Sequence, residues 1–225
     1  MRKLIYIPII HAYSDMGSAA PALERQSIDY IGNDRWVKHK ATVKRFWENM
    51  STYFASLDAA NLKIFQDGLP VDGEVGIKIV LKAANQDSAN YRIILDLVKR
   101  GAVLCKTEDP SLLKVELEQL NSFTGLKTDR AKRSSYSEYK SGREKLAIDR
   151  DKFVAASIDT CLMEGESGVL FMGSYHDVLK YLPSNIEIKQ VKDREKVNAY
   201  FKELLTKGND SKLKELSDYL VFPPQ

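Results

Sequence analysis

The stretch that decides the fold is residues 167–183, SGVLFMGSYHDVLKYLP. Its apolar run at residues 169–172 predicts a buried β-strand, and Gly173 with the polar residues after it predicts a tight turn. Apolar residues then recur at helical spacing, which predicts a short helix after the turn. The turn therefore brings His176 to the carboxyl end of a strand, where open α/β sheets usually bind their ligands.

A second strand-like run lies at the other end of the chain, where residues 4–10, LIYIPII, are followed by His11. Its continuous apolar side chains predict burial on both faces, as in a central strand. Because Pro8 cannot donate a ladder hydrogen bond, we expect the strand to be irregular or at a sheet edge there. Two of the three histidines in the chain therefore close predicted strands.

Segments with a helical spacing of apolar residues separate the predicted strands. Further strands are expected at residues 62–68, 102–106 and 186–191, the last one half exposed and at an edge. Helices are expected at residues 19–31, 35–57, 75–85, 88–100, 111–120, 149–164, 192–207 and 211–220. This alternation predicts an α/β fold, with a mostly parallel central sheet flanked by helices and a helical excursion around residues 111–165. The length of 225 residues suits a single domain, residues 1–225.

The composition excludes several classes of protein. With 44% hydrophobic and 29% charged residues, the chain is too apolar to be disordered. No apolar run approaches the roughly 20 residues that a membrane-spanning helix needs. The short apolar run after Met1, which Pro8 interrupts, indicates a strand rather than a signal peptide. Cys105 and Cys161 show no metal-type spacing and no disulfide framework, so we expect thiols in a reducing, cytoplasmic setting.

Residues 125–148 differ in character and are expected to form a basic surface excursion. Between residues 127 and 145, seven basic side chains stand against three acidic ones, with Tyr136 and Tyr139 among them. Such a stretch can bind nucleic acid through phosphate contacts and base stacking. The interrupting acids and a net charge of only +3 count against that interpretation and favour a solvated face.

Five side chains are candidates for chemistry because each lies at the carboxyl end of a predicted strand: His11, Asp67, Glu108, Asp109 and His176. The carboxyl ends of parallel strands share one edge of the sheet, so these side chains could converge there. His11, His176, Asp67 and Glu108 would suit a divalent metal, Zn²⁺ or Mn²⁺, with an open position for water. Without a metal, a histidine and a carboxylate could act as base and acid. The alternative is that the two histidines only hydrogen-bond loop backbone.

Three other polar residues receive structural interpretations. Asp34 is predicted to cap the helix that follows it, and Ser174 to cap the short helix after the turn. His39 lies between Lys38 and Lys40 in a predicted helix, so we expect it on a solvated face.

The motif around the deciding stretch resembles that of a known superfamily. Residues 149–151, DRD, open a helix that precedes the apolar strand and the turn GSYH at residues 173–176. Upstream, PIIH at residues 8–11 ends the first strand, and FQDGLP spans residues 65–70. This order resembles the TraB/Tiki/ChaN/erythromycin-esterase superfamily, which has two Gly-x-x-His turns and a strand ending in Glu. The chain departs from that pattern at Pro8, in place of glycine, and at Asp67, in place of glutamate.

The resemblance implies an α/β fold with a cleft between two halves, each contributing a histidine. Branches of the superfamily include metal-dependent peptide hydrolases, esterases and haem-binding proteins. By correspondence of motifs, His11, Asp67 and His176 would be the catalytic or metal-binding set. Arg150 would orient a carboxylate or bind an anion in the cleft.

The leading hypothesis is a cytoplasmic hydrolase that acts on an ester or peptide bond through a His/carboxylate cleft, assisted by a divalent metal. Its substrate would be a small molecule or a peptide. One alternative is a non-catalytic module of the same fold that binds a small molecule or cofactor. Another is a nucleic-acid-associated protein that works through residues 127–145, whose binding would weaken steeply with salt.

Overall fold

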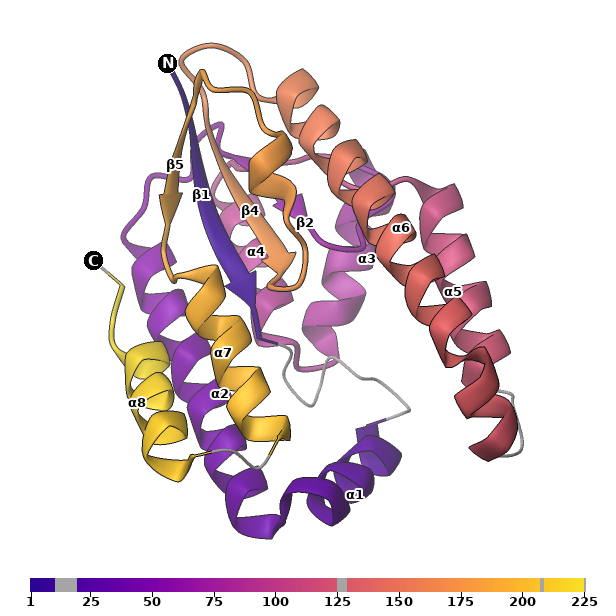
Figure 1. Cartoon of the computed structure of the whole chain (residues 1–225). Helices are drawn as coiled ribbons and strands as arrows, with labels where there is room; N and C mark the ends of the chain where they lie inside the picture. Colours follow the sequence, from indigo (N-terminus) through magenta and orange to yellow (C-terminus); the bar gives the residue numbers. More distant parts are fainter. Residues whose placement is uncertain (11–19, 125–128, 207–208, 225) are drawn as a thin grey trace.

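In the computed structural model (Figure 1), residues 1–10, 20–124, 129–206 and 209–224 are described. Within them, five parallel strands form one sheet in the order β3-β2-β4-β1-β5. The strands are β1 (Arg2–Ile9), β2 (Lys63–Gln66), β3 (Val103–Leu104), β4 (Ser167–Gly173) and β5 (Ile186–Gln190). The predicted α/β class and parallel sheet are confirmed, and β5 lies at an edge as expected.

The two apolar runs that precede His11 and His176 form β1 and β4, which lie side by side in the sheet. β1 and β4 pair from Lys3 opposite Ser167 to Ile9 opposite Gly173. Their carboxyl ends therefore reach the same edge of the sheet, as the sequence predicted. β1 is not an edge strand, because β5 pairs with its other side as far as Tyr6.

Pro8 fits into β1 because the neighbouring strand β5 has already ended at that point, and not because β1 is irregular. Val191 N donates to Tyr6 O, so the backbone of Tyr6 faces β5, and two residues later Pro8 faces the same way. The pairing with β5 has ended by then, at Tyr6 opposite Gln190. The missing N–H of Pro8 therefore interrupts no ladder hydrogen bond.

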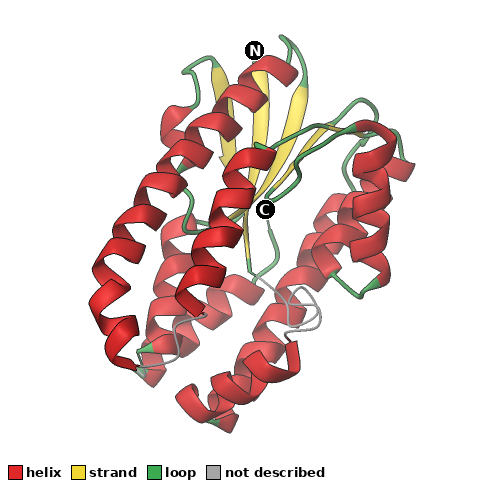
Figure 2. Cartoon of the chain, turned by 90° about the vertical axis from the view of Figure 1, so that its right-hand side faces the viewer, coloured by secondary structure: helices red, strands yellow, loops and turns green. Residues whose placement is uncertain are grey.

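Helices cover both faces of the sheet (Figure 2). One core contains Ile7, Ile64 and Phe171 of the sheet and side chains from six helices. Those helices are α1 (Ala20–Ile31), α2 (Asn33–Ala55), α3 (Gly73–Asn85), α4 (Ala89–Lys99), α7 (Arg194–Leu205) and α8 (Asp210–Val221). The opposite core joins Leu4 and Leu170 to α6 (Asp129–Cys161) and to the 3₁₀ helix η2 (Val178–Tyr181).

The helical excursion around residues 111–165 is a hairpin of α5 (Pro110–Thr124) and α6, which Figure 1 shows side by side. α6 is one helix of 33 residues, so the expected excursion at 125–148 and the expected helix at 149–164 are largely the same element. The side chains of residues 123–139 lie outside the described part, and with them most of the predicted basic stretch. In the rest of that stretch, Lys140 pairs with Glu144 across one helical turn at 3.9 Å.

The chain leaves neighbouring strands toward opposite faces of the sheet. After β4 it enters η2, on the face covered by α6, whereas after β1 and β2 it continues to α2 and α3 on the other face. Such reversals open a crevice at the carboxyl ends of the strands. The turn after β4 therefore lies where an open α/β sheet most often binds a ligand.

Two predicted surface features of α2 are wrong. Helix α2 begins at Asn33 after an N-cap at Gly32, so Asp34 lies inside the first turn and does not cap it. His39 is only 8% exposed, and its Nδ1 lies 2.9 Å from the hydroxyl of Tyr200. Burial lowers the pKa of His39 to about 4, which keeps it neutral. The prediction relied on the flanking Lys38 and Lys40. Residues one apart on a helix point in different directions, so lysine neighbours do not imply that His39 is exposed.

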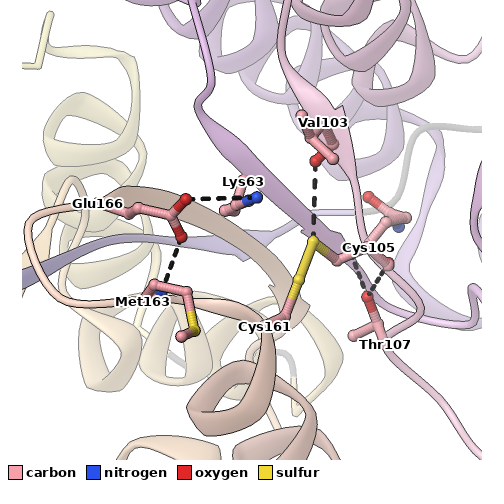
Figure 3. Close-up of a disulfide and its surroundings, with 8 residues drawn as sticks. Lys63, Val103, Cys105, Thr107, Cys161, Met163 and Glu166 are labelled. Atoms are coloured by element: carbon pink, nitrogen blue, oxygen red, sulfur yellow. Dashed lines mark hydrogen bonds and ion pairs between the residues drawn. A yellow bond between two sulfur atoms is a disulfide. The ribbon is translucent and has the colours of Figure 1, made fainter.

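A disulfide joins Cys105 to Cys161, contrary to the expectation of thiols (Figure 3). It connects the chain just after β3 to the last residue of α6, and beside it Lys63 pairs with Glu166 at 3.4 Å. The 56-residue separation gives no local signature, since the two sulfurs meet only when α6 packs back onto the sheet. In the ranges that the structure describes, no helix combines the length and apolarity needed to cross a membrane.

Candidate functional site

Arg150 is the centre of a buried ion cluster at the carboxyl edge of the sheet. It lies on α6, is 2% exposed, and contacts three carboxylates from different elements. Its Nη2 donates to Asp67, after β2, at 2.9 Å and to Glu108, after β3, at 2.7 Å. Its Nε donates to the second oxygen of Glu108 at 3.2 Å, and its Nη1 donates to Glu116 of α5 at 2.9 Å. One guanidinium thus holds three segments together.

The cluster carries an excess of negative charge. Burial raises the pKa of Glu108, which is 0% exposed, although its hydrogen bonds from Arg150 act in the opposite direction. Burial disfavours the charged form of Arg150, but the hydrogen bond and charge of Glu108 and the charge of Asp67 outweigh it and raise the Arg150 pKa. Three carboxylates facing one cation would stabilise an additional positive charge near the cluster.

Gly173 allows the end of β4 to approach this cluster. Its N–H donates to the second oxygen of Asp67 at 3.1 Å, so the backbone of the turn fixes that carboxylate. A Cβ at this position would lie 3.0 Å from the ring of Tyr175 and 3.1 Å from Asp67. A larger residue would therefore displace one of them.

The next feature along the turn is a His–Asp pair. His176 is 1% exposed, and its Nδ1 lies 2.5 Å from Oδ1 of Asp151, the neighbour of Arg150 on α6. The other oxygen of Asp151 accepts a hydrogen bond from the N–H of Asp177 at 2.8 Å. An acceptor at Nδ1 assigns the proton to that nitrogen and leaves Nε2 as a base. Nε2 is buried and has no hydrogen-bond partner among the described residues.

Tyr175 lies between the His–Asp pair and the ion cluster. Its ring centroid is 4.1 Å from that of His176, and its hydroxyl is 3.5 Å from Nη1 of Arg150. Burial and the charge of Asp67 raise its pKa to about 12, so the hydroxyl stays protonated at neutral pH. Tyr6 of β1 also has a buried hydroxyl with no partner in the described part of the chain.

A pocket of about 370 Å³ opens beside this group, between α5, α6 and the turn after β4. Its polar lining comes from six side chains of both charges: Glu116, Lys140, Arg143, Glu144, Arg150 and Tyr175. Tyr175 therefore contacts both the pocket and the imidazole of His176, which does not line the pocket itself.

The structure brings together three of the residues that the sequence singled out, Asp67, Glu108 and Arg150. His176 is at the same edge, close enough for its charge to lower the pKa of Glu108, but its hydrogen bond goes to Asp151. The alternative interpretation was that His176 only hydrogen-bonds loop backbone. Its imidazole instead has a side-chain partner, Asp151. His11 lies outside the described residues.

Two polar residues near the site have structural roles. Asp109 caps α5, because its carboxylate accepts from the N–H of Ser111 at 2.7 Å while Pro110 takes the first helical position. Ser174 was predicted to cap η2, but no side chain caps that helix. The side chain of Ser174 is buried, and its backbone oxygen accepts from Asn198 at 2.9 Å.

Sequence reasoning missed Asp151, Glu116 and Tyr175 as members of the site. Asp151 belongs to the segment DRD at residues 149–151, in which only Arg150 has a predicted role. A signal was present, because adjacent helical residues point about 100° apart and can serve two neighbouring groups. Glu116 belongs to the distant helix α5, and nothing in its spacing indicates the contact with Arg150.

The predicted metal site is not assembled by the described side chains. Among them, no group of three or more histidine, cysteine, aspartate or glutamate residues could hold a metal ion. Asp67 and Glu108 both direct carboxylate oxygens at Arg150, and Nδ1 of His176 is engaged by Asp151. These residues do not fit a metal centre by themselves, and a site completed by His11 stays a prediction.

No family model, curated protein or solved structure matches this chain. The resemblance to the TraB/Tiki/ChaN/erythromycin-esterase superfamily therefore stays a prediction. The geometry of the site is the basis for assigning a function.

Proposed function

We propose that this chain hydrolyses an ester or peptide bond, with His176 as the general base. The observation that supports this most is the imidazole itself, held at one nitrogen by Asp151 and unpaired at the other. A histidine oriented in this way by a carboxylate is the usual arrangement for taking a proton from an attacking oxygen. Its position after β4 is also where this kind of sheet places ligands.

The proposed reaction uses water as the nucleophile. Nε2 of His176 accepts a proton from water while the water oxygen attacks the carbonyl carbon of the substrate. Asp151 stabilises the imidazolium that forms, and the imidazolium then donates its proton to the departing alcohol or amine. Arg150 acts as a positioning residue in this scheme, because it fixes Asp67 and Glu108 and is adjacent to Asp151 on the helix.

Access to Nε2 requires a movement of Tyr175 in this proposal. The tyrosine ring packs on the imidazole and lines the pocket, so its rotation would connect the pocket to the base. Rotation of a side chain that is partly exposed takes place on the picosecond to nanosecond scale, far faster than typical turnover.

The test is a screen of the purified chain against panels of esters and short peptides. The variants are His176→Gln and Asp151→Asn, with Asp149→Asn on the same helix as the matched control. We expect a loss of about 10²-fold or more in kcat for the first two, as is usual when a general base is removed. The control should retain wild-type turnover. A wild type without turnover on any ester or peptide, or variants as active as wild type, would contradict the proposal.

A non-catalytic binding module is the second candidate, and the burial of Nε2 favours it. In that case the pocket would retain a small polar molecule without changing it. Mass spectrometry of the ligand before and after incubation distinguishes the two, because only hydrolysis adds water to the ligand.

A further inference from the structure

A second cavity, which we call the α2–α8 groove, lies between helices α2 and α8 and the end of α7. Its volume is about 750 Å³, and it shares no lining residue with the pocket beside Arg150. Leu204, Leu213 and Val221 contribute apolar side chains to its lining. Small-molecule sites have this size and combine a mostly apolar wall with a few polar groups.

Three contacts show that α2 and α8 run in the same direction along the groove. They join the two helices at successive levels: Arg35 with Asp210, Thr42 with Ser217, and Asn49 with Val221. The residues that line the groove can therefore be ordered along it by their numbers in either helix.

The charged groups are unevenly distributed along the α2–α8 groove. Its two acids, Asp34 and Asp210, lie at the first level, where Arg35 pairs with Asp210. At the later levels the described lining includes no acid, and the cations there are Lys38, Arg45 and Lys214. A concave surface lined by one sign of charge attracts ligands of the opposite sign, so this part of the groove favours an anion.

Two of these cations are available to a ligand. Lys38 and Arg45 are exposed, and neither side chain forms an ion pair or a hydrogen bond with a residue in the described ranges. They are seven residues apart on α2, which places them on the same face of the helix. Lys214, by contrast, pairs with Asp218 at 2.6 Å, so its charge is already compensated.

His39 adds a buried polar group to the lining of the groove. It is 8% exposed, and Tyr200 engages its Nδ1, whereas its Nε2 forms no hydrogen bond within the part of the chain that the structure describes. Tyr200 can donate to Nδ1, because burial raises the pKa of its hydroxyl to about 12 and keeps it protonated. The neutral imidazole then carries its proton on Nε2, which makes this nitrogen a donor to an anionic ligand.

We infer that the α2–α8 groove binds a small amphiphilic anion, with its negative charge on the side of Lys38 and Arg45 and its apolar part against Leu204 and Leu213. The charge of the later levels and the unpaired nitrogen of His39 require an anionic group, and the apolar lining requires an apolar body. The inference does not depend on the proposed hydrolase, because the two cavities have no residue in common.

The experiment is a calorimetric titration of the whole chain with three probes of equal length: octanoate, 1-octanol and octylammonium. We expect octanoate to bind about tenfold more tightly than octanol, as for a gained hydrogen bond to a charged group, and octylammonium to bind more weakly than octanol. The preference for octanoate should shrink as salt is added, because exposed cations are screened. Equal binding of all three probes, a preference for octylammonium, or no binding of octanoate would overturn the inference.

A pair of double variants assigns the charge. Lys38→Gln with Arg45→Gln should remove the preference for octanoate and leave the binding of octanol unchanged, which also shows that the groove is intact. Lys44→Gln with Lys78→Gln is the control, since it removes two exposed cations outside the groove and changes the net charge equally. This control should keep the preference. A similar loss in both double variants would indicate a general effect of charge and contradict the assignment.

The imidazole offers a measurement that needs no variant. The chain has three histidines, so their ¹⁵N resonances can be assigned individually. The Nε2 resonance of His39 should shift during titration with octanoate and stay unchanged with octylammonium. An unchanged resonance at saturating octanoate would place the ligand elsewhere and overturn the inference.

A second copy of the chain is the other occupant that the groove could accept. Light scattering distinguishes the two cases. A dimer that octanoate does not dissociate, but that Lys38→Gln with Arg45→Gln does, would assign the groove to self-association and overturn the inference. A monomer that binds octanoate with the expected preference would support it.

Discussion

Arg150 is the residue on which the ion cluster depends most. Replacing it by methionine keeps much of the side-chain volume but leaves Glu108 and Asp67 without their cation. Breaking a buried ion pair from one side destabilises a protein by about 3–5 kcal/mol. We expect Arg150→Met to lower the free energy of unfolding by an amount in that range, measured by urea denaturation.

The matched control is Lys145→Met on the same helix, which removes an exposed cation and should change stability by less than about 0.5 kcal/mol. A loss in Arg150→Met as small as that of the control would show that the three carboxylates do not need the guanidinium.

His39 should make stability depend on acid. Burial lowers its pKa to about 4 in the folded chain, compared with about 6.5 when unfolded. Between these values the unfolded state binds more protons, so stability rises with pH across the window and is lost as the pH falls from 6.5 to 4. The full difference corresponds to about 3 kcal/mol.

The measurement is the free energy of unfolding at several pH values for wild type and His39→Gln. The difference between the two should depend on pH only between about pH 4 and 6.5. A parallel decline in both proteins would assign the acid sensitivity to other groups.

Among individual residues, the sequence identified the site residues at strand ends and missed those whose place depends on how the helices pack. Asp67, Glu108 and His176 were found because a strand end places a side chain at the sheet edge whatever the details of the fold. Asp151 was missed because its role depends on how α6 is rotated over the sheet, which no spacing in the sequence reveals. The burial of His39 depends in the same way on Tyr200, which is 161 residues away.

At the scale of elements, the disulfide between Cys105 and Cys161 is expected to stabilise the packing of α6 on the sheet. Closing a loop of this length removes conformational entropy from the unfolded chain, which amounts to about 4 kcal/mol in the chain-entropy treatment. We expect the double variant Cys105→Ser with Cys161→Ser to lose about 2–4 kcal/mol.

Urea denaturation with and without a dithiol reductant checks this expectation. Reductant should destabilise wild type and leave the double variant unchanged. If wild type is equally stable under both conditions, the bond does not contribute to stability.

The elements also show where sequence patterns are sufficient and where they are not. The helix predicted at residues 88–100 is α4, and Gly101 follows its end with a φ of 103°, a backbone conformation that glycine adopts readily. Helix α6 begins 20 residues before the helix predicted at residues 149–164, because the early part of α6 has no apolar periodicity. Besides packing on the sheet, α6 contacts α5.

Over the whole molecule, a single sheet separates two cores. One core contains Trp47 and Phe46 of α2, and the other contains Val154 and Ile158 of α6. Because both cores contain side chains of β1, β2 and β4, we expect them to unfold together in one cooperative transition. The denaturation curves from tryptophan fluorescence and from far-ultraviolet circular dichroism should coincide. Two separated midpoints would show that the α5–α6 side unfolds as an independent unit.

The class of the fold followed from the alternation of strands and helices, but the order of the strands did not. The insertion of β4 between β2 and β1 depends on long connections, through α5 and α6, whose path leaves no trace in local patterns. That insertion is what brings His176 near Asp67 and Glu108. The members of the site could therefore be named in part from the sequence, whereas their contacts required the arrangement of the whole sheet.

The bond between Cys105 and Cys161 also makes the segment between them part of a covalent ring. A protease that cuts once anywhere between the two cysteines would leave both pieces attached to each other. Such a nicked chain would migrate as one species in a denaturing gel without reductant and as two fragments with it. The α5–α6 hairpin, which forms one wall of the pocket, could thus be severed and still remain tethered beside Arg150.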